Sequence, residues 1–320
     1  MDVCFEKNLP SHDYLFSIVD NVTSVLENEK KDWRPLSSDG VPGSLISFSN
    51  NLPLIVVPDL HARTNFIKHI LDYKICPNDD FINIDREITV LNALENKMLN
   101  IVLVGDIIHT ERRTIQRWQK ARTEINNNDF YGQAMTGEMI DSLTTLLSVM
   151  MLKIMFSDNF HILKGNHENI LIKTSNGDYS FRKCADEGNM VNRFMRERYG
   201  DDILYLISCF EKNLPLMFVS GRTVISHAEP KDFFTREQII NARLDGKVIE
   251  GLTWTNNGEA FDGTALYIIK EMISCYDEND CVYLAGHRPV TEIFNILQNG
   301  SFVQIHNPSR ENVAFVYNDI

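Results

Sequence analysis

Short apolar runs of strand length recur along the chain, and most of them end in a cluster of polar residues. Five runs show this pattern: LPLIVV (52–57) before PDLHAR, NIVLV (100–104) before GDIIH, FHIL (160–163) before KGNHE, TVIS (223–226) before HAEP, and CVYLA (281–285) before GHRPV. Short runs rich in Ile, Val and Leu are typical of buried strands. Two more runs, SFVQIH (301–306) and VAFVY (313–317), also predict strands.

Segments with the period of an amphipathic helix lie between these runs. They are TNFIKHILDY (64–73), capped by Thr64, then TIQRWQKARTEI (114–125), residues 135–156, and one helix from Met190 to Leu206. Strands that alternate with helices predict an α/β fold. Ligands of such folds bind beyond the carboxyl ends of the strands, which is where the polar clusters fall.

The chain contains no linker long enough to mark a domain boundary. We therefore expect a single domain over residues 1–320, with residues 1–50 as an N-terminal extension packed on it. Within that extension, residues 14–29 predict a covering helix and LISF (45–48) predicts an edge strand. The polar segments 32–44 and 173–180 predict loops.

The net charge of −13 gives the chain no general attraction to nucleic acid or to anionic membranes. The longest apolar stretch, LLSVMMLKIMF (146–156), is too short to span a bilayer, and the N-terminus lacks the pattern of a secretory signal. Six scattered cysteines without a CxxC pair are typical of reduced thiols. We expect a cytoplasmic protein that binds neither nucleic acid nor membrane.

Asp, Asn and His side chains dominate the polar clusters after the strands. The candidates are Asp59, His61, Asp106, Asn166, His167, His227 and His287. Any one of them alone is more often a turn residue, a helix cap or an ordinary histidine, but all of them together at strand ends indicate a site. Carboxylate, amide and imidazole donors suit Mn, Fe, Zn or Ni better than Ca.

Two metal ions held close together require a shared carboxylate, which Asp106 could supply. Asp59 and His61 could reach one ion, and Asn166, His227 and His287 could complete the other. Such a pair of ions lowers the pKa of a water and binds an anionic oxygen, which is the chemistry of phosphoester hydrolysis. His167 could then serve as the general acid for the leaving oxygen.

The motifs resemble those of the calcineurin-like metallophosphoesterases, and within them the branch of serine/threonine protein phosphatases and symmetrical diadenosine tetraphosphate hydrolases. The corresponding segments are PDLHA (58–62), GDIIHTE (105–111), GNHE (165–168), SHAEP (226–230), GLTW (251–254) and GHRPV (286–290). The resemblance implies a four-layer α/β/β/α sandwich of two central mixed sheets flanked by helices.

The resemblance also implies the role of each site residue. Asp59, His61 and Asp106 would bind the first metal ion. Asp106, Asn166, His227 and His287 would bind the second. His167 would be the general acid.

The second motif departs from the family at two positions. His109 stands where the family has an aspartate that orients the acid histidine, and Thr110 stands where it has a phosphate-binding arginine. We expect Glu111 to orient His167 instead. Phosphate would be bound by Arg112 or Arg113, with Arg63 as a further candidate, because an arginine fork suits two phosphate oxygens. A solvated surface charge is the competing interpretation for each arginine.

The remaining conspicuous residues predict structural roles. In segment 114–125 we expect Ile115 and Trp118 to pack inward. His69, His161 and His306 have no motif context, and we interpret them as structural.

The sequence thus predicts a dinuclear metal-dependent phosphoesterase that cleaves a phosphomonoester or phosphoanhydride by attack of metal-bound hydroxide. Manganese is the first choice of cofactor, with Fe, Zn and Ni as alternatives. A phosphoprotein, a dinucleoside polyphosphate and a small phosphoester all remain open as substrate. The competing hypothesis is a non-catalytic metal- or phospho-ligand-binding module on the same scaffold, motivated by His109 and Thr110.

Overall fold

Two central sheets organise the molecule. The computed structural model describes residues 5, 7–48, 52–77, 79, 81–274 and 276–317. The first sheet has the order β12-β2-β5-β6, and its strands are β2 (Leu54–Val57), β5 (Asn100–Leu103), β6 (Phe160–Ile162) and β12 (Ala314–Val316). Strands β2, β5 and β6 are parallel, and β12 is antiparallel to β2.

The second sheet has the order β1-β7-β8-β9-β11-β10. Its strands are β1 (Leu45–Phe48), β7 (Met217–Ser220), β8 (Thr223–Ser226), β9 (Val282–Ala285), β10 (Asn295–Leu297) and β11 (Phe302–Gln304). Strands β8, β9 and β11 are mutually parallel, whereas β7 and β10 are antiparallel to their neighbours β8 and β11. A separate two-stranded sheet joins β3 (Lys74–Ile75) and β4 (Ile88–Thr89).

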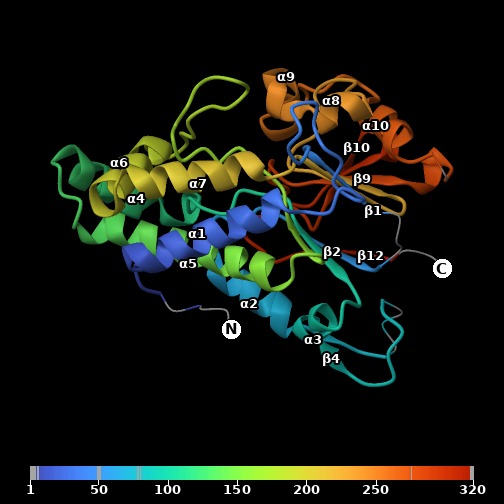
Figure 1. The fold of residues 1–320 in the computed structure, drawn as a ribbon, viewed down its shortest axis with the longest axis horizontal. Helices are drawn as coiled ribbons and strands as arrows, with labels where there is room; N and C mark the ends of the chain where they lie inside the picture. The colour runs from blue at the N-terminus through green and yellow to red at the C-terminus, as the bar shows by residue number, and fades with distance from the viewer. Residues whose placement is uncertain are drawn as a thin grey trace.

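Helices cover the outer face of each sheet (Figure 1). The first sheet carries α1 (His12–Glu27), α2 (Thr64–Asp72), α3 (Val90–Glu95), α4 (Ile115–Asn126), α5 (Gln133–Met155), α6 (Glu187–Tyr199) and α7 (Asp201–Asn213). The second carries α8 (Arg236–Ile240), α9 (Gly246–Thr253) and α10 (Thr264–Met272). Short 3-10 turns are η1 (Arg112–Thr114), η2 (Ala242–Leu244), η3 (Glu278–Asp280) and η4 (Gln298–Gly300).

The alternation of side chains along each strand produces the layers. Leu54 and Val56 of β2 face the second sheet and pack with Phe218 of β7, whereas Ile55 and Val57 face the helices. Successive side chains of a strand point to opposite faces, so a fully apolar strand supplies two cores at once. The result is the predicted α/β/β/α sandwich with two mixed sheets, which is confirmed.

The structure corrects three local predictions. Residues 190–206 do not form one helix, because Gly200 adopts φ 91° and separates α6 from α7. Thr64 is the first residue of α2 and not its cap, and its hydroxyl lies 2.7 Å from that of Thr145. Trp118 is fully buried as expected, but Ile115 opens α4 and stays 39% exposed.

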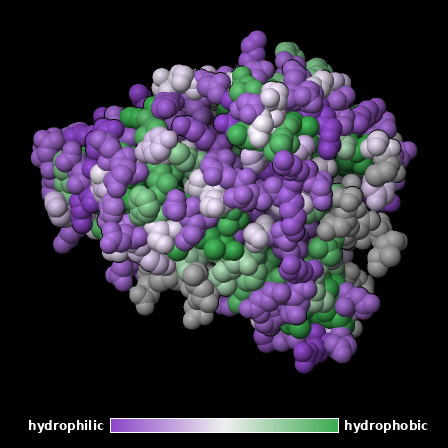
Figure 2. Space-filling model, viewed as in Figure 1, coloured by the Kyte–Doolittle hydropathy of each residue, from purple (hydrophilic) through white to green (hydrophobic). Residues whose placement is uncertain are grey.

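The predicted N-terminal helix and edge strand correspond to α1 and β1. Just beyond α1, the buried Glu29 carboxylate pairs with both Arg34 and Lys153, and Lys153 belongs to α5. Residues 1–50 as an extension of a single domain over 1–320 stay a prediction. Figure 2 shows one face on which hydrophilic side chains cover most of the surface. No helix in the described ranges combines the length and apolar character needed to cross a bilayer.

His161 of β6 lies in the layer between the sheets and gives the fold a pH dependence. Its ring packs against Trp33, Phe48 and Phe218 at centroid distances of 5.5, 5.2 and 5.2 Å. Burial lowers the pKa of His161 well below its usual value, and the charge of Lys153 lowers it further.

As the pH falls, we expect His161 to become protonated in the unfolded chain but to stay neutral in the folded one. Above the unfolded pKa of about 6.5, His161 is neutral in both states and does not change the free energy of unfolding with pH. Below it, protonation of the unfolded chain lowers the free energy of unfolding, by about 2 kcal/mol between about pH 7 and pH 5. Urea unfolding at both pH values should show this loss reduced by about that amount in His161→Phe. An unchanged loss in the variant would mean that other groups carry the acid sensitivity.

Candidate metal centre

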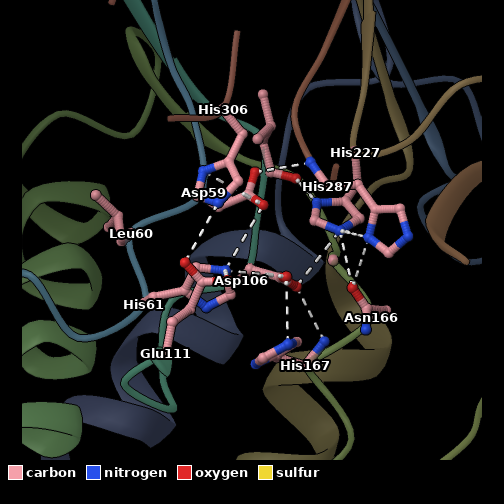
Figure 3. Close-up of polar contacts among 12 residues, drawn as sticks. Asp59, Leu60, His61, Asp106, Glu111, Asn166, His167, His227, His287 and His306 are labelled. Carbon is pink, nitrogen blue, oxygen red and sulfur yellow. Dashed lines mark hydrogen bonds and ion pairs between the residues drawn. The ribbon is translucent and has the colours of Figure 1, made fainter. Parts of the chain in front are cut away.

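The predicted site residues converge at the carboxyl ends of strands from both sheets (Figure 3). The loops after β2, β5 and β6 contribute Asp59, His61, Asp106, Asn166 and His167, and the ends of β8 and β9 contribute His227 and His287. Asp106 lies between two groups of side chains, one around Asp59 and His61 and the other around Asn166 and His227.

Glu168 fixes the loops that carry these residues. Its buried carboxylate accepts hydrogen bonds from the backbone N–H groups of Asp106 and Gly165 at 2.9 and 2.7 Å, and from that of Ile107 at 2.9 Å. A Cβ atom on Gly165 would lie 2.3 Å from the Asp106 carboxylate, so only glycine permits this approach. Glu168 of the GNHE motif therefore has a structural function here.

The backbone at the site is strained. His61, Ala62, Asp106, His109 and His287 all have positive φ values, between 44° and 64°. Each such conformation costs about 1–3 kcal/mol and persists only where the surroundings impose it. A concentration of strain at one place is typical of a functional site.

The second group consists of Asn166, His227 and His287. His227 donates from Nδ1 to the carbonyl of Val104 at 3.0 Å, so in the neutral ring Nε2 carries a bare lone pair. That nitrogen lies 3.0 Å from Asn166 Oδ1 and 3.2 Å from His287 Nδ1. Ligands at about 2.1 Å from one ion lie about 3 Å apart, so a cation between these atoms would remove their repulsion.

The first group is larger than the sequence predicted. His61 Nε2 lies 3.7 Å from Asp59 Oδ2, 3.8 Å from Asp106 Oδ2 and 3.5 Å from Glu111 Oε1. His306, which we interpreted as structural, lies in this group and places Nδ1 3.7 Å from Asp59 Oδ2. The available signal was that His306 follows a strand, as the other site histidines do, but without a neighbouring motif residue.

Unequal charge environments surround the two aspartates. Burial raises the pKa of Asp106 well above its usual value, and the charges of Asp59 and Glu168 raise it further. Burial acts on Asp59 in the same direction, but His306, His227 and His61 together lower the pKa of Asp59 to about 2. A cation shared by both carboxylates would relieve the repulsion between them.

The donor set fits divalent transition-metal ions. Within the described part of the chain, several buried donor atoms at the centre have no hydrogen-bond partner, Asp59 Oδ2 and both ring nitrogens of His306 among them. Buried polar atoms normally have partners. Oxygen and imidazole donors without thiolate favour Mn, Fe, Zn or Ni over Ca.

His167 is held by His109. Their Nδ1 atoms lie 3.1 Å apart, so one ring donates to the other, and Phe181 packs against His167 with centroids 3.6 Å apart. Nε2 of His167 lies 3.5 Å from Asp106. Glu111, which we expected to orient His167, instead contacts His61 and lies 2.9 Å from the Lys183 ammonium.

A basic pocket of about 530 Å³ opens beside His61 and Glu111. Its cationic residues are Arg63, Arg112, Arg113, Lys183 and Arg288. The sequence predicted a phosphate-binding role for Arg63, Arg112 and Arg113, but not for Lys183 or Arg288. Arg63 uses its guanidinium on backbone carbonyls, those of Asp59 and Leu60 among them.

The other arginines of the pocket differ in whether their side chains already make hydrogen bonds within the protein. Arg113 donates to the carbonyls of His61 and Ala62, both at 3.0 Å. No side-chain hydrogen bond or ion pair links Arg112 or Arg288 to another described residue. These two cations are the most available to a ligand.

Comparison with solved structures identifies the fold. The chain is similar to a protein serine/threonine phosphatase from Saccharomyces cerevisiae, with 16% identity, a TM-score of 0.55, and coverage of 93% of this chain and 77% of that one. It also matches a cold-active protein-tyrosine phosphatase from a psychrophilic Shewanella species, with 13% identity and coverage of 81% and 72%, but the TM-score of 0.44 is too low to support an argument. No protein-family model and no curated protein sequence matches the chain. The chain thus has the fold of that serine/threonine phosphatase, and it holds buried clusters of His and Asp.

We expect Asp106→Asn to change stability in opposite directions with and without metal. Without metal, the variant should be more stable than wild type, because the substitution removes a buried carboxyl from beside Asp59 and Glu168. With manganese at about 100 times its dissociation constant, wild type should gain about 2.7 kcal/mol and the variant much less. Thermal unfolding in chelator and in manganese measures both effects.

Equal stabilisation of wild type and Asp106→Asn by manganese would place the ion elsewhere. His69→Gln is the matched control, because this imidazole pairs with Glu311 on the surface. It should respond to manganese as wild type does.

Proposed function

We propose that the protein is a dinuclear metal-dependent phosphoesterase. The observation that carries the proposal is the convergence of two groups of side chains that could hold metal ions on one carboxylate, that of Asp106, beside a basic pocket. Asp59, His61 and Asp106 would hold one ion, and Asp106, Asn166, His227 and His287 the other, with manganese as the first choice. A phosphomonoester or phosphoanhydride would be the substrate.

The charges of the site suit a phosphoryl group. When bound, two dications would offset the charge of the phosphate and lower the pKa of an attacking water. The basic pocket opens beside His61, so Arg112 and Arg288 can bind phosphate oxygens while the phosphorus faces the centre. Arg63 and Arg113 act mainly by holding the loop of residues 59–62 through its carbonyls.

His167 would deliver the proton to the leaving oxygen. In this proposal His109 replaces the family aspartate as the group that orients the His167 ring, through the contact between the two Nδ1 atoms. Phe181 covers the ring and excludes water from that side. Glu111 has no part in orienting His167 and belongs to the metal side of the centre.

The second candidate function is a binding module without catalysis. Thr110 favours it, because its hydroxyl contacts Glu138 and Thr114 and Thr110 is buried, so it supplies no phosphate contact in place of an arginine. Loss of one phosphate contact is compatible with catalysis if Arg112 or Arg288 replaces it. Turnover therefore separates the two candidates.

We expect His167→Asn to lower kcat for an aryl or alkyl phosphate by about 10²- to 10⁴-fold, the usual contribution of a general acid. The effect should be larger for an alkyl phosphate, whose leaving group requires the proton more. Steady-state kinetics in manganese provide the measurement, and metal content should match that of wild type. A wild-type rate no higher than that of the variant would favour the binding module.

We expect Arg112→Ala to raise KM for a phosphoester by about tenfold or more, because a hydrogen bond between charged groups contributes about 1.5–3 kcal/mol. Arg288→Ala should act in the same direction. Arg122→Ala is the matched control, since Arg122 is exposed on α4 and does not line the pocket. If Arg112→Ala and Arg288→Ala have the same KM as wild type and Arg122→Ala, the pocket is not the phosphate site.

A further inference from the structure

Two side chains beyond those implied by the family resemblance face the first metal position. We propose that Glu111 and His306 are ligands of that position, so that five protein groups surround it and four surround the second. The inference rests on the proposed dinuclear centre and deepens it. Its consequence is an unequal pair of sites, in which the first ion is held tightly and the second exchanges readily.

His306 has the burial and orientation of a ligand. Its side chain is 0% exposed, and neither ring nitrogen has a hydrogen-bond partner among the described residues. The residue follows β11, which pairs in parallel with β9, and β9 leads to His287. The two strand ends therefore deliver His306 to one side of Asp59 and His287 to the other, as Figure 3 shows.

Glu111 completes the same group from the other sheet. Its carboxylate lies 3.5 Å from His61 Nε2 through Oε1 and 3.5 Å from His306 Nε2 through Oε2. Its side chain is 9% exposed. The carboxylate is thus buried between two imidazoles that also face Asp59.

The alternative is an ion-pair network without metal, in which a protonated His306 joins Asp59 and Glu111. Hydrogen bonds between charged groups are short, about 2.7–2.9 Å for nitrogen and oxygen. The distances from His306 to Asp59 and Glu111 are 3.7 and 3.5 Å, which are too long for such bonds. Donor atoms at these distances leave room for a cation between them.

The count of charges predicts which ion is held more tightly. The first position has three carboxylates, from Asp59, Asp106 and Glu111, whereas the second has only the shared Asp106. Affinity for a dication rises with the number of charged ligands. Lys183, 2.9 Å from Glu111, offsets part of this charge and lies on the solvent side.

The test is the metal content of the full chain after loading with manganese and stepwise dialysis against chelator. Wild type should start near two equivalents and keep one through the first steps. His306→Gln and Glu111→Gln should each weaken the retained equivalent by at least about tenfold. His287→Gln, in the second position, should lose the weak equivalent and keep the tight one.

If His306→Gln fails to fold, Glu111→Gln still tests the proposal. Gln has nearly the same size as Glu, and residue 111 lies at the edge of the centre, so this variant should fold. Circular dichroism verifies the fold of each variant. Retention of the tight equivalent in Glu111→Gln would overturn the proposal. So would a lower stability of either variant in chelator with unchanged metal retention, the result expected of an ion-pair network.

Phosphoester turnover measured on the same samples separates this inference from the proposed function. Ordered metal loss without any turnover would support the ligands and refute the enzyme. Turnover by wild type with unaltered metal retention in Glu111→Gln would support the enzyme and refute the ligands.

Discussion

The candidate site depends on one carboxylate, that of Glu168. By accepting hydrogen bonds from the N–H groups of Asp106, Ile107 and Gly165, it joins the loops that follow β5 and β6. Hydrogen bonds to a charged group contribute about 1.5–3 kcal/mol each, enough to offset the left-handed backbone of Asp106, which costs about 1–3 kcal/mol. This connection, together with the hydrogen bond from the His167 N–H to the Asp106 carboxylate, fixes Asp106 between the two groups of donors.

The sequence predicted most of this arrangement because its signals are local. A run of Ile, Val and Leu that ends in polar residues marks a strand end, and strand ends of two sheets meet at one edge. The sequence could not predict β10, because its residues are largely exposed. It also could not predict the break at Gly200, because a single glycine does not reveal whether a helix continues or ends there. His306 was missed because its role depends on β11 pairing with β9, a contact between distant segments.

Two features of the second motif, His109 and Glu111, together change where negative charge lies in the site. His109 brings a neutral ring to His167, and burial together with His61 lowers the pKa of His109 to about 3, so the ring stays neutral. Two residues later, the carboxylate of Glu111 lies against His61 and His306. The phosphatase motif that the chain resembles places a negative charge beside the acid histidine, whereas the proposal here places that charge beside the first metal position, at Glu111. The substitution at His109 and the presence of Glu111 are therefore two parts of one redistribution.

The contrast between the net charge of the chain and the charge of the pocket bears on the class of ligand. A net charge of −13 repels anions at long range, but screening limits that field to about 8 Å at physiological ionic strength. Inside that distance, Arg112, Arg288 and their neighbours in the pocket present a positive surface of their own. A ligand with one phosphoryl group and a largely uncharged remainder is attracted by the cations of the pocket and is only weakly repelled by the negative charge of the whole chain. A long polyanion meets both, so under the proposed function the electrostatics favour a substrate whose charge is confined to its phosphoryl group.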